Sequence, residues 1–461
     1  MEKVDAHFDK MTKTPVSKLI LTLGIPTTIS MLITNFYNLV DTYFVGELGT
    51  SQQGSIGILF TLQGIIQAIA FMLGHGSGTF VAKALAKKDV DEASKYVSTA
   101  YFLGGGLGLL LLILGLIFIK PFMMLLGSTE TILPYATTYG FWVLVSTPFL
   151  ICSLILNNNL RYEGKAFFAM IGLTCGAVIN ILGDYLLIKV FNLGVFGAGL
   201  STAVSQIISF ILLYVLYKMF SQSKIRIKYI STDFYCYKQI LMVGFPSLIR
   251  QSLNSLSNGI LNNVTKIYGD NAIAAMSVIN RFSNFVVCVG IGIAQGLQPV
   301  AAFNYQVKEY TRVKKGLLFT ISFGMTFISI LSLFGIIWPE AVIRIFQKDE
   351  AVINIGKLGI RAASIGILFL PISVTMNMLF QSIQRPVLAS ILALLRSGLI
   401  FIPILIIFEK IFNLNGILVA QPVADFVTCL LCLPFLFWFL FKTSNTIDNL
   451  LNKEWVRNDN N

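Results

Sequence analysis

The sequence predicts an all-α integral membrane protein with twelve transmembrane helices in two pseudo-symmetric six-helix lobes. Three observations predict this class. First, 55% of the 461 residues are hydrophobic and 12% are charged, whereas soluble globular chains are about 45–50% apolar and about 25% charged. Second, long apolar segments recur along the chain without the period-two alternation of membrane β-strands. Third, the two halves resemble one another. The composition therefore excludes soluble enzymes, secreted modules and disordered proteins.

Each membrane-spanning helix needs about 20 predominantly apolar residues. The first span is long enough to tilt or bend, and Pro26 is positioned to bend it, because proline removes a backbone hydrogen bond. Twelve segments meet the requirement, in chain order: 19–45, 54–76, 96–119, 134–157, 166–188, 194–217, 239–264, 272–298, 316–338, 357–380, 387–408 and 413–441.

Positive charge predicts the orientation of these spans. Of the 34 Lys and Arg residues, 23 lie in the terminal segments and every second connection, seven lie on the opposite side, and four fall within spans. Because cytoplasmic connections are enriched in Lys and Arg, both termini are predicted to be cytoplasmic. The net charge of +12 is therefore a topology signal, and nucleic acid is not an expected partner.

The longest polar connection, residues 218–238, divides the chain into six spans and six, so the lobes are expected at residues 1–225 and 226–461. Parallel repeats with a substrate path between them are a recurrent plan of secondary transporters. At offsets of 220 or 221 positions the matching segments include Gly24-Ile25-Pro26 with Gly244-Phe245-Pro246, Asn38 with Asn258, Gly49 with Gly269, and Phe191-Asn192-Leu193 with Phe412-Asn413-Leu414.

Several separated motifs point to one family. They are Asp41-Thr42-Tyr43-Phe44-Val45-Gly46-Glu47-Leu48-Gly49, Leu160-Arg161-Tyr162-Glu163-Gly164, Asn180-Ile181-Leu182-Gly183-Asp184-Tyr185 and Gly296-Leu297-Gln298-Pro299-Val300-Ala301-Ala302-Phe303-Asn304-Tyr305. From about Ser17 to Leu440 the chain resembles the multidrug and toxic compound extrusion (MATE) family, most closely its bacterial DinF-like branch. The resemblance implies a secondary antiporter in a bacterial cell membrane that exports amphipathic, often cationic, compounds in exchange for H⁺ or Na⁺.

Polar residues at matching depth in the first lobe predict a coupling site. Asp41 and Asp184 each lie about four residues from the outer end of a span, and Asn180 precedes Asp184 by one turn. The next span, 194–217, begins on the outer side, which puts Thr202 at similar depth. Ionisable groups at this depth are costly and indicate function. Their oxygens suit Na⁺, and two neighbouring buried carboxylates favour proton uptake. In the alternative interpretation, each Asp caps a helix or pairs with a lysine such as Lys189. The resemblance also implies that these four residues form the first-lobe cation or proton site.

The second lobe offers an internal comparison. The positions that match the four predicted ligands are all apolar, so coupling is expected in the first lobe alone: Leu261, Phe401, Leu405 and Val423. Asp425, in the twelfth span, is the buried carboxylate of the second lobe, and its role is left open.

Other polar residues are candidates for the substrate path. Tyr37 and Asn38 are expected to line the cavity, and the resemblance adds Asn157. His75 is either structural or a proton relay. Four arginines within spans could contact substrate or lipid headgroups, or could bond carbonyl groups of neighbouring helices: Arg250, Arg281, Arg361 and Arg396.

Three other functions are alternatives to an antiporter. A lipid-linked oligosaccharide flippase of the same superfamily would be expected to have more spans and a basic central cavity, whereas the sequence predicts twelve spans and no cluster of cavity arginines. A membrane-embedded enzyme would need a nucleophile–base pair or metal ligands, yet the chain has two histidines, one of them (His7) in the polar N-terminal segment. An ion channel would carry flux without exchange.

No nucleotide-binding loop is present in the sequence, so ATP is not the expected energy source. We expect no cofactor and no metal beyond Na⁺ at the coupling residues. The expected partners are small-molecule drugs or toxic metabolites and membrane lipid, and the protein is expected to be a monomer.

Overall fold

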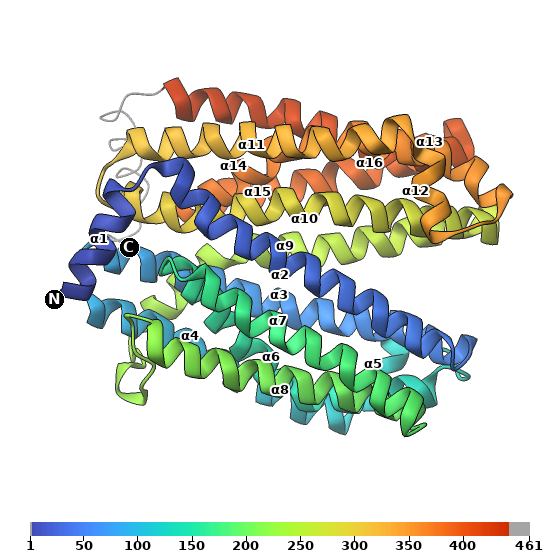
Figure 1. Ribbon diagram of the computed structural model, residues 1–461, viewed down its shortest axis with the longest axis horizontal. Coiled ribbons are helices and arrows are strands. Elements are labelled where there is room, and N and C mark those ends of the chain that lie inside the picture. The colour runs from blue at the N-terminus through green and yellow to red at the C-terminus, as the bar shows by residue number, and fades with distance from the viewer. Residues whose placement is uncertain (1, 442–461) are drawn as a thin grey trace.

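The computed structural model describes residues 2–441 (Figure 1). Within them every regular element is a helix, and the predicted cytoplasmic C-terminus lies outside the described residues. The first half contains α1 (Glu2–Lys13), α2 (Val16–Gly46), α3 (Thr50–Ala86), α4 (Val90–Ile117), α5 (Ile119–Leu125), α6 (Leu133–Tyr162), α7 (Ala166–Asp184), η1 (Tyr185–Val190) and α8 (Gly194–Phe220). The second half contains η2 (Ile227–Tyr229), α9 (Phe234–Thr265), η3 (Lys266–Tyr268), α10 (Asp270–Gln306), α11 (Tyr310–Ile337), α12 (Pro339–Phe346), α13 (Glu350–Ile367), α14 (Leu370–Ser382), α15 (Pro386–Leu394), η4 (Leu395–Ile400) and α16 (Phe401–Phe441).

These helices supply the twelve predicted spans. By length and hydropathy, nine helical segments among the described residues could cross a membrane, or ten if the bent pair α13 and α14 is one span. One of these nine segments, Pro386–Phe441, has 56 residues. A helix of that length would extend about 84 Å, far more than the thickness of one bilayer core. Asn413, with φ of 52°, divides it into two spans. The twelfth is α9, whose polar residues lower its hydropathy.

Hydropathy located the spans but not the helix ends. α3 continues to Ala86 and α10 to Gln306, several turns beyond the predicted ends at 76 and 298. Polar residues can extend a helix outside the apolar part of the membrane, so a hydropathy window ends before the helix does. The tenth predicted span is broken between α13 and α14, with a bend of 45°.

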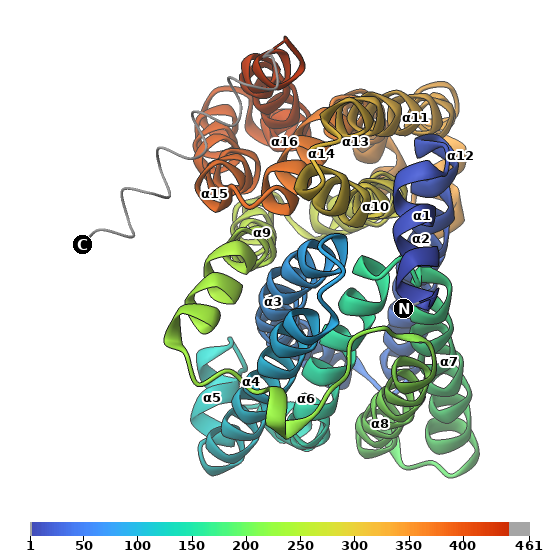
Figure 2. The ribbon, with the colours of Figure 1, turned by 90° about the vertical axis from the view of Figure 1, so that its left-hand side faces the viewer.

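The backbone repeats between the two halves, which face one another in Figure 2. The predicted lobe boundary at residues 225 and 226 falls in the connection from α8 to α9 and stays a prediction. Left-handed backbone conformations recur at offsets of 220 or 221 positions: Gly49 (φ 138°) with Gly269 (86°), Lys88 (62°) with Lys308 (63°), Gly164 (74°) with Gln384 (60°), and Asn192 (54°) with Asn413 (52°).

The halves touch most closely where α3 crosses α9. A Cβ at Gly76 would lie 2.1 Å from the carbonyl oxygen of Ile240, and one at Gly244 would lie 1.8 Å from that of Met72. Both distances are far inside van der Waals contact, so only glycine permits this approach. Gly76 is ten residues from the end of α3 that lies near α1 and 26 from the other. The close contact between the two halves therefore lies nearer to the α1 end of the molecule.

The repeat produces a second crossing, between α2 and α10. Gly24 and Gly296 match Gly244 and Gly76, and a Cβ at Gly296 would lie 2.7 Å from the Cα of Gly24. α2 runs as one helix through Pro26, which lies beside this crossing. The predicted bend at Pro26 is not tested by this conformation.

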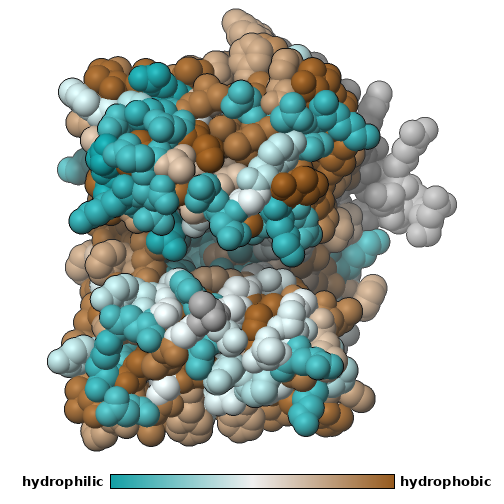
Figure 3. Space-filling model, turned by 90° about the vertical axis from the view of Figure 1, so that its right-hand side faces the viewer, coloured by the Kyte–Doolittle hydropathy of each residue, from teal (hydrophilic) through white to brown (hydrophobic). Residues whose placement is uncertain are grey.

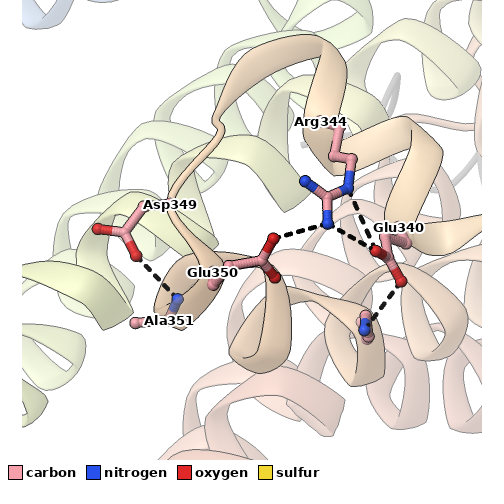
Figure 4. Close-up of polar contacts among 6 residues, drawn as sticks. Glu340, Arg344, Asp349, Glu350 and Ala351 are labelled. Atoms are coloured by element: carbon pink, nitrogen blue, oxygen red, sulfur yellow. Dashed lines mark hydrogen bonds and ion pairs between the residues drawn. The ribbon is translucent and has the colours of Figure 1, made fainter.

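The end opposite α1 carries exposed ion pairs rather than close helix crossings. Arg344 pairs with Glu340 (2.8 Å) and Glu350 (2.7 Å), and Lys357 pairs with Glu340 (2.9 Å), while Asp349 caps α13 (Figure 4). The hydrogen bond from Lys357 and that from Arg344 lower the pKa of Glu340. Exposed pairs of this kind contribute little to stability. All of these residues belong to the second half, so these pairs do not join it to the first.

Candidate ion and substrate sites

The structure brings the four predicted coupling residues into one buried cluster in the first half. Asp41 of α2 is 4% exposed and Asp184, the last residue of α7, is 0% exposed. The Asn180 side-chain amide donates to Thr202 Oγ1 of α8 at 3.3 Å. Asp184 follows Asn180 by one turn of α7, and α7 packs against α2, which carries Asp41. Three helices therefore supply one polar site.

A fifth residue, Tyr139 of α6, joins the cluster and was missed by the sequence analysis. Its hydroxyl donates to Asp41 Oδ2 (2.9 Å) and lies 3.0 Å from Thr202 Oγ1. A signal for it existed, because Tyr139 is five residues inside the predicted span 134–157, at the depth of the other members. Its position alone does not indicate an ion site, because a tyrosine is neutral and common near membrane interfaces.

Four oxygens of the cluster are buried without a hydrogen-bonding partner among the described residues: Asp41 Oδ1, Asn180 Oδ1, Asp184 Oδ1 and Asp184 Oδ2. A buried acceptor left unpaired is costly, and more so when it is charged. Carboxylate and amide oxygens are the donors that hard cations prefer, and a proton would equally satisfy a carboxylate. The site is therefore chemically suited to take up H⁺ or Na⁺.

The structure argues against the alternative interpretation of the two acids. Lys189 pairs with Glu47, at the end of α2, and not with Asp184. Asp41 lies within α2, and Asp184, between α7 and η1, makes no side-chain capping hydrogen bond. Neither capping nor a lysine partner explains their burial.

The matching region of the second half is apolar in three dimensions as well. Leu261, Phe401 and Leu405 are buried together in one hydrophobic cluster. Val423 is partly buried, next to Ala424 of the same cluster. A site of the first-half kind is therefore excluded from these positions.

A cavity of about 480 Å³ lies between the two halves. At the end opposite α1 the surface is hollowed between them (Figure 3). Asp41 and Asp184 are not part of the wall, so the acid pair lies behind it. The wall includes all three predicted cavity residues and two members of the ion cluster: Tyr37, Asn38, Asn157, Asn180 and Thr202.

Asn157 also holds two helices together. Its side-chain amide donates to the carbonyl oxygen of Ala169 at 2.9 Å, tying α6 to α7. Its repeat counterpart, Asn377, makes the same bond to Ala389 at 2.6 Å. This duplication indicates a structural contribution from Asn157 in addition to its place on the cavity wall.

The expectation that no arginines would cluster in the cavity is wrong. Arg161, Arg250 and Arg396 line it, together with Asp425. The sequence places Arg161 in a cytoplasmic connection, but α6 continues to Tyr162 and the Arg161 side chain is only 3% exposed. One of the two sequence arguments against a flippase is thereby removed, while the twelve spans remain.

The in-span arginines bond side chains rather than helix carbonyl groups. Arg250 Nη1 donates to Asn377 Oδ1 (2.8 Å), and Arg396 Nε donates to Asp425 Oδ1 (3.0 Å). Asp425 is 3% exposed and thus forms a buried ion pair. Arg281 and Arg361 are exposed and lie outside the cavity wall.

His75 of α3 sits in a buried polar network between the halves. Arg161 Nη2 lies 3.0 Å from His75 Nε2, and Ser247 Oγ of α9 lies 2.8 Å from Nδ1. Because a guanidinium can only donate, Nε2 must accept and the proton must be on Nδ1. Arg161 also donates to Gln295 of α10. His75 is therefore neutral in this arrangement, which connects both halves.

Comparisons with known proteins agree with this architecture. The family model MatE matches residues 26–186 and 246–407. The chain is 26% identical over 440 residues to a protein named multidrug export protein MepA from Staphylococcus saprophyticus, covering 95% of this chain and 96% of that one. It is 27% identical over 441 residues to the protein of the same name from Staphylococcus aureus strain NCTC 8325, with the same coverage.

Solved structures share the fold at low sequence identity. A MATE protein in complex with MaL6 has a TM-score of 0.89 at 22% identity, covering 94% of this chain and 98% of that chain. A multidrug resistance MATE family transporter of the MOP superfamily, in an outward-facing conformation, has a TM-score of 0.87 at 22% identity and the same coverage. The DinF-like branch stays a prediction. Because the family model covers more than half of its length, the chain belongs to the MATE family.

Proposed function

We propose that the protein is a secondary active multidrug efflux antiporter of a bacterial cytoplasmic membrane. It exports amphipathic compounds, cationic ones among them, in exchange for H⁺ or Na⁺, and works as a monomer. Relatives matched over nearly their whole length carry the name multidrug export protein. The cavity between two repeated halves provides the substrate path that this plan of transporter requires.

One observation carries the coupling part of the proposal: four oxygens of Asp41, Asn180 and Asp184 are buried without partners. A bound cation or proton supplies what these oxygens lack. Its release leaves two carboxylates buried close together, which is unfavourable. The energy of the cluster therefore depends on occupancy, and occupancy can bias the arrangement of α2, α7 and α8.

The protein exchanges substrate for the ion if the ion and the substrate stabilise different arrangements of the two halves. With the termini in the cytoplasm, the close crossings toward α1 seal the inner side and the cavity faces outward. α2 carries both Asp41 and the crossing at Gly24, with Pro26 between them. A change of charge at Asp41 that bends α2 at Pro26 would loosen the α2–α10 crossing.

Transport in proteoliposomes tests the coupling residues. Asp41→Asn and Asp184→Asn should each abolish gradient-driven export of ethidium while leaving expression and ethidium binding intact. Asp270→Asn is the control, since it removes an exposed carboxylate that lies outside the cavity wall. Imposing a pH gradient and a sodium gradient separately identifies the ion. Wild-type export by either Asn variant, at equal protein level, would refute the assignment of that residue.

A further inference from the structure

The charged side chains on the cavity wall are unevenly distributed. Among the described residues they are three arginines and one aspartate, Asp425, and the aspartate is already paired with Arg396. The acid pair of the first half lies behind the wall. The remaining cations, Arg161 and Arg250, therefore give the cavity an uncompensated positive charge.

Arg161 and Arg250 have only neutral partners in the part of the chain that the structure describes. Arg161 bonds Asn158 Oδ1 (2.5 Å), His75 Nε2 and Gln295. No ion pair joins it to a carboxylate, and its Nε is buried without an acceptor. A buried guanidinium without a counter-charge is costly in a membrane protein.

The two guanidinium groups belong to one local cluster. His75 lies between Arg161 and Ser247, and Arg250 Nη2 reaches Ser247 Oγ at 3.5 Å. Both guanidinium groups are thus part of one hydrogen-bonded network, and they carry the same charge. Such proximity of like charges is unfavourable unless an anion is shared between them.

We propose that Arg161 and Arg250 bind the oxyanion of an amphipathic substrate, a carboxylate, sulfonate or phosphate group. Guanidinium groups recognise oxyanions through paired hydrogen bonds. Apolar residues of the same cavity wall receive the rest of the molecule, among them Phe71, Leu150 and Leu173. This inference rests on the proposed function, because it names a substrate class for the same cavity.

The position of this site gives it a part in transport. Arg161 belongs to α6 in the first half and Arg250 to α9 in the second. An oxyanion held by both contacts both halves near the crossing of α3 and α9. When the halves separate on that side, the two arginines move apart and the anion loses one of its two ligands. The motion that opens the inner side therefore lowers the affinity of the protein for the anion.

Binding of a matched pair of ligands tests the proposal. The full chain in phosphatidylcholine nanodiscs is titrated with dansyl-phenylalanine and with dansyl-phenylalaninamide, which differ only in a carboxylate against an amide. The acid should bind about tenfold or more tightly, as expected for a charge-assisted hydrogen bond. Arg250→Gln should bring the two dissociation constants within about threefold of one another. Arg281→Gln, an exposed arginine outside the wall, should preserve the preference.

Binding of dansyl-phenylalaninamide also checks that each variant is folded, because the dissociation constant of this neutral ligand should be the same in every variant. A second arm replaces part of the phosphatidylcholine with phosphatidylglycerol. Competition by this lipid assigns the site to a lipid phosphate, and its absence assigns the site to a soluble organic anion. Equal binding of acid and amide by the wild type, or an undiminished preference in Arg250→Gln, overturns the proposal. Because no gradient is applied, the result is independent of the coupling role given to Asp41 and Asp184.

Discussion

The docking of α1 should weaken as the pH falls, because of His7. This side chain is 6% exposed and packs edge-on against Phe303 of α10, with ring centroids 5.5 Å apart. Burial, together with the charges of Lys165 and Lys10, lowers the pKa of His7 to about 4. In an undocked α1 the ordinary pKa of about 6.5 applies.

The sign and size of the effect follow from these two values. A pKa depressed in the docked state stabilises docking above about pH 6.5, and this stabilisation is lost as the pH falls toward 4. Between pH 7 and pH 5 docking should lose about 2 kcal/mol, or roughly a 20-fold change in its equilibrium constant. The ion pair of Asp5 with Lys88 should persist over this range, because the hydrogen bond from Lys88 lowers the pKa of Asp5.

Hydrogen exchange of the Glu2–Lys13 amides measures this opening. After correction for the intrinsic pH dependence of exchange, protection of α1 should fall about 20-fold between pH 7 and pH 5 in the wild type. In His7→Phe, which keeps an aromatic ring against Phe303, protection should hardly change. Equal protection at the two pH values in the wild type would refute the reasoning from burial.

Four further predictions concern the crossing, the site, the cavity and the topology. Gly76→Ala should shift the conformational equilibrium away from the inward-closed state, raising cytoplasmic labelling of a cavity cysteine, whereas Gly106→Ala, where a Cβ meets nothing within 4 Å, should not. Tyr139→Phe removes a hydrogen bond to Asp41 and should weaken coupled export about tenfold at unchanged expression; unchanged export would show that this bond is dispensable. Replacing Tyr37 by Ala should alter export unevenly across drugs, and a uniform loss would instead place Tyr37 in the ion site or the fold. A single cysteine at the C-terminus should resist an impermeant thiol reagent applied outside intact cells, and labelling would contradict the cytoplasmic assignment.

The sequence predicts most of the fold because the membrane imposes strong local constraints. Span length and composition identify twelve segments, and the spacing of 220 positions predicts the repeat. The sequence also predicts that Asp41, Asn180, Asp184 and Thr202 lie at the same depth in the membrane. A helix rises by a fixed distance per residue, so the position of a residue within its span gives its depth. What the sequence misses depends on side-chain direction: Tyr139 is reached only by knowing which face of α6 meets α2.

Arg161 illustrates the same limit for charge. By sequence it belongs to a basic connection, and the positive-inside rule counts it as cytoplasmic. The structure turns its side chain into the protein, where it bonds partners from α3 and α10. Hydropathy cannot distinguish an arginine that ends a span in water from one that turns back into the core.

The two halves have similar backbone conformations but different residues at the positions of the ion cluster. This difference bears on how binding of an ion in the first half could change the arrangement of both halves. Glycine pairs related by the repeat form both helix crossings, α3 with α9 and α2 with α10, so the two crossings are nearly symmetric. The first half holds unsatisfied oxygens where the second packs Leu261, Phe401 and Leu405. An apolar cluster has no protonation state, so these positions of the second half should respond to an ion gradient only through contacts with the first half. A polar site transplanted by Leu261→Asp should therefore destabilise the protein by leaving a buried charge without ligands, rather than create a second coupled site.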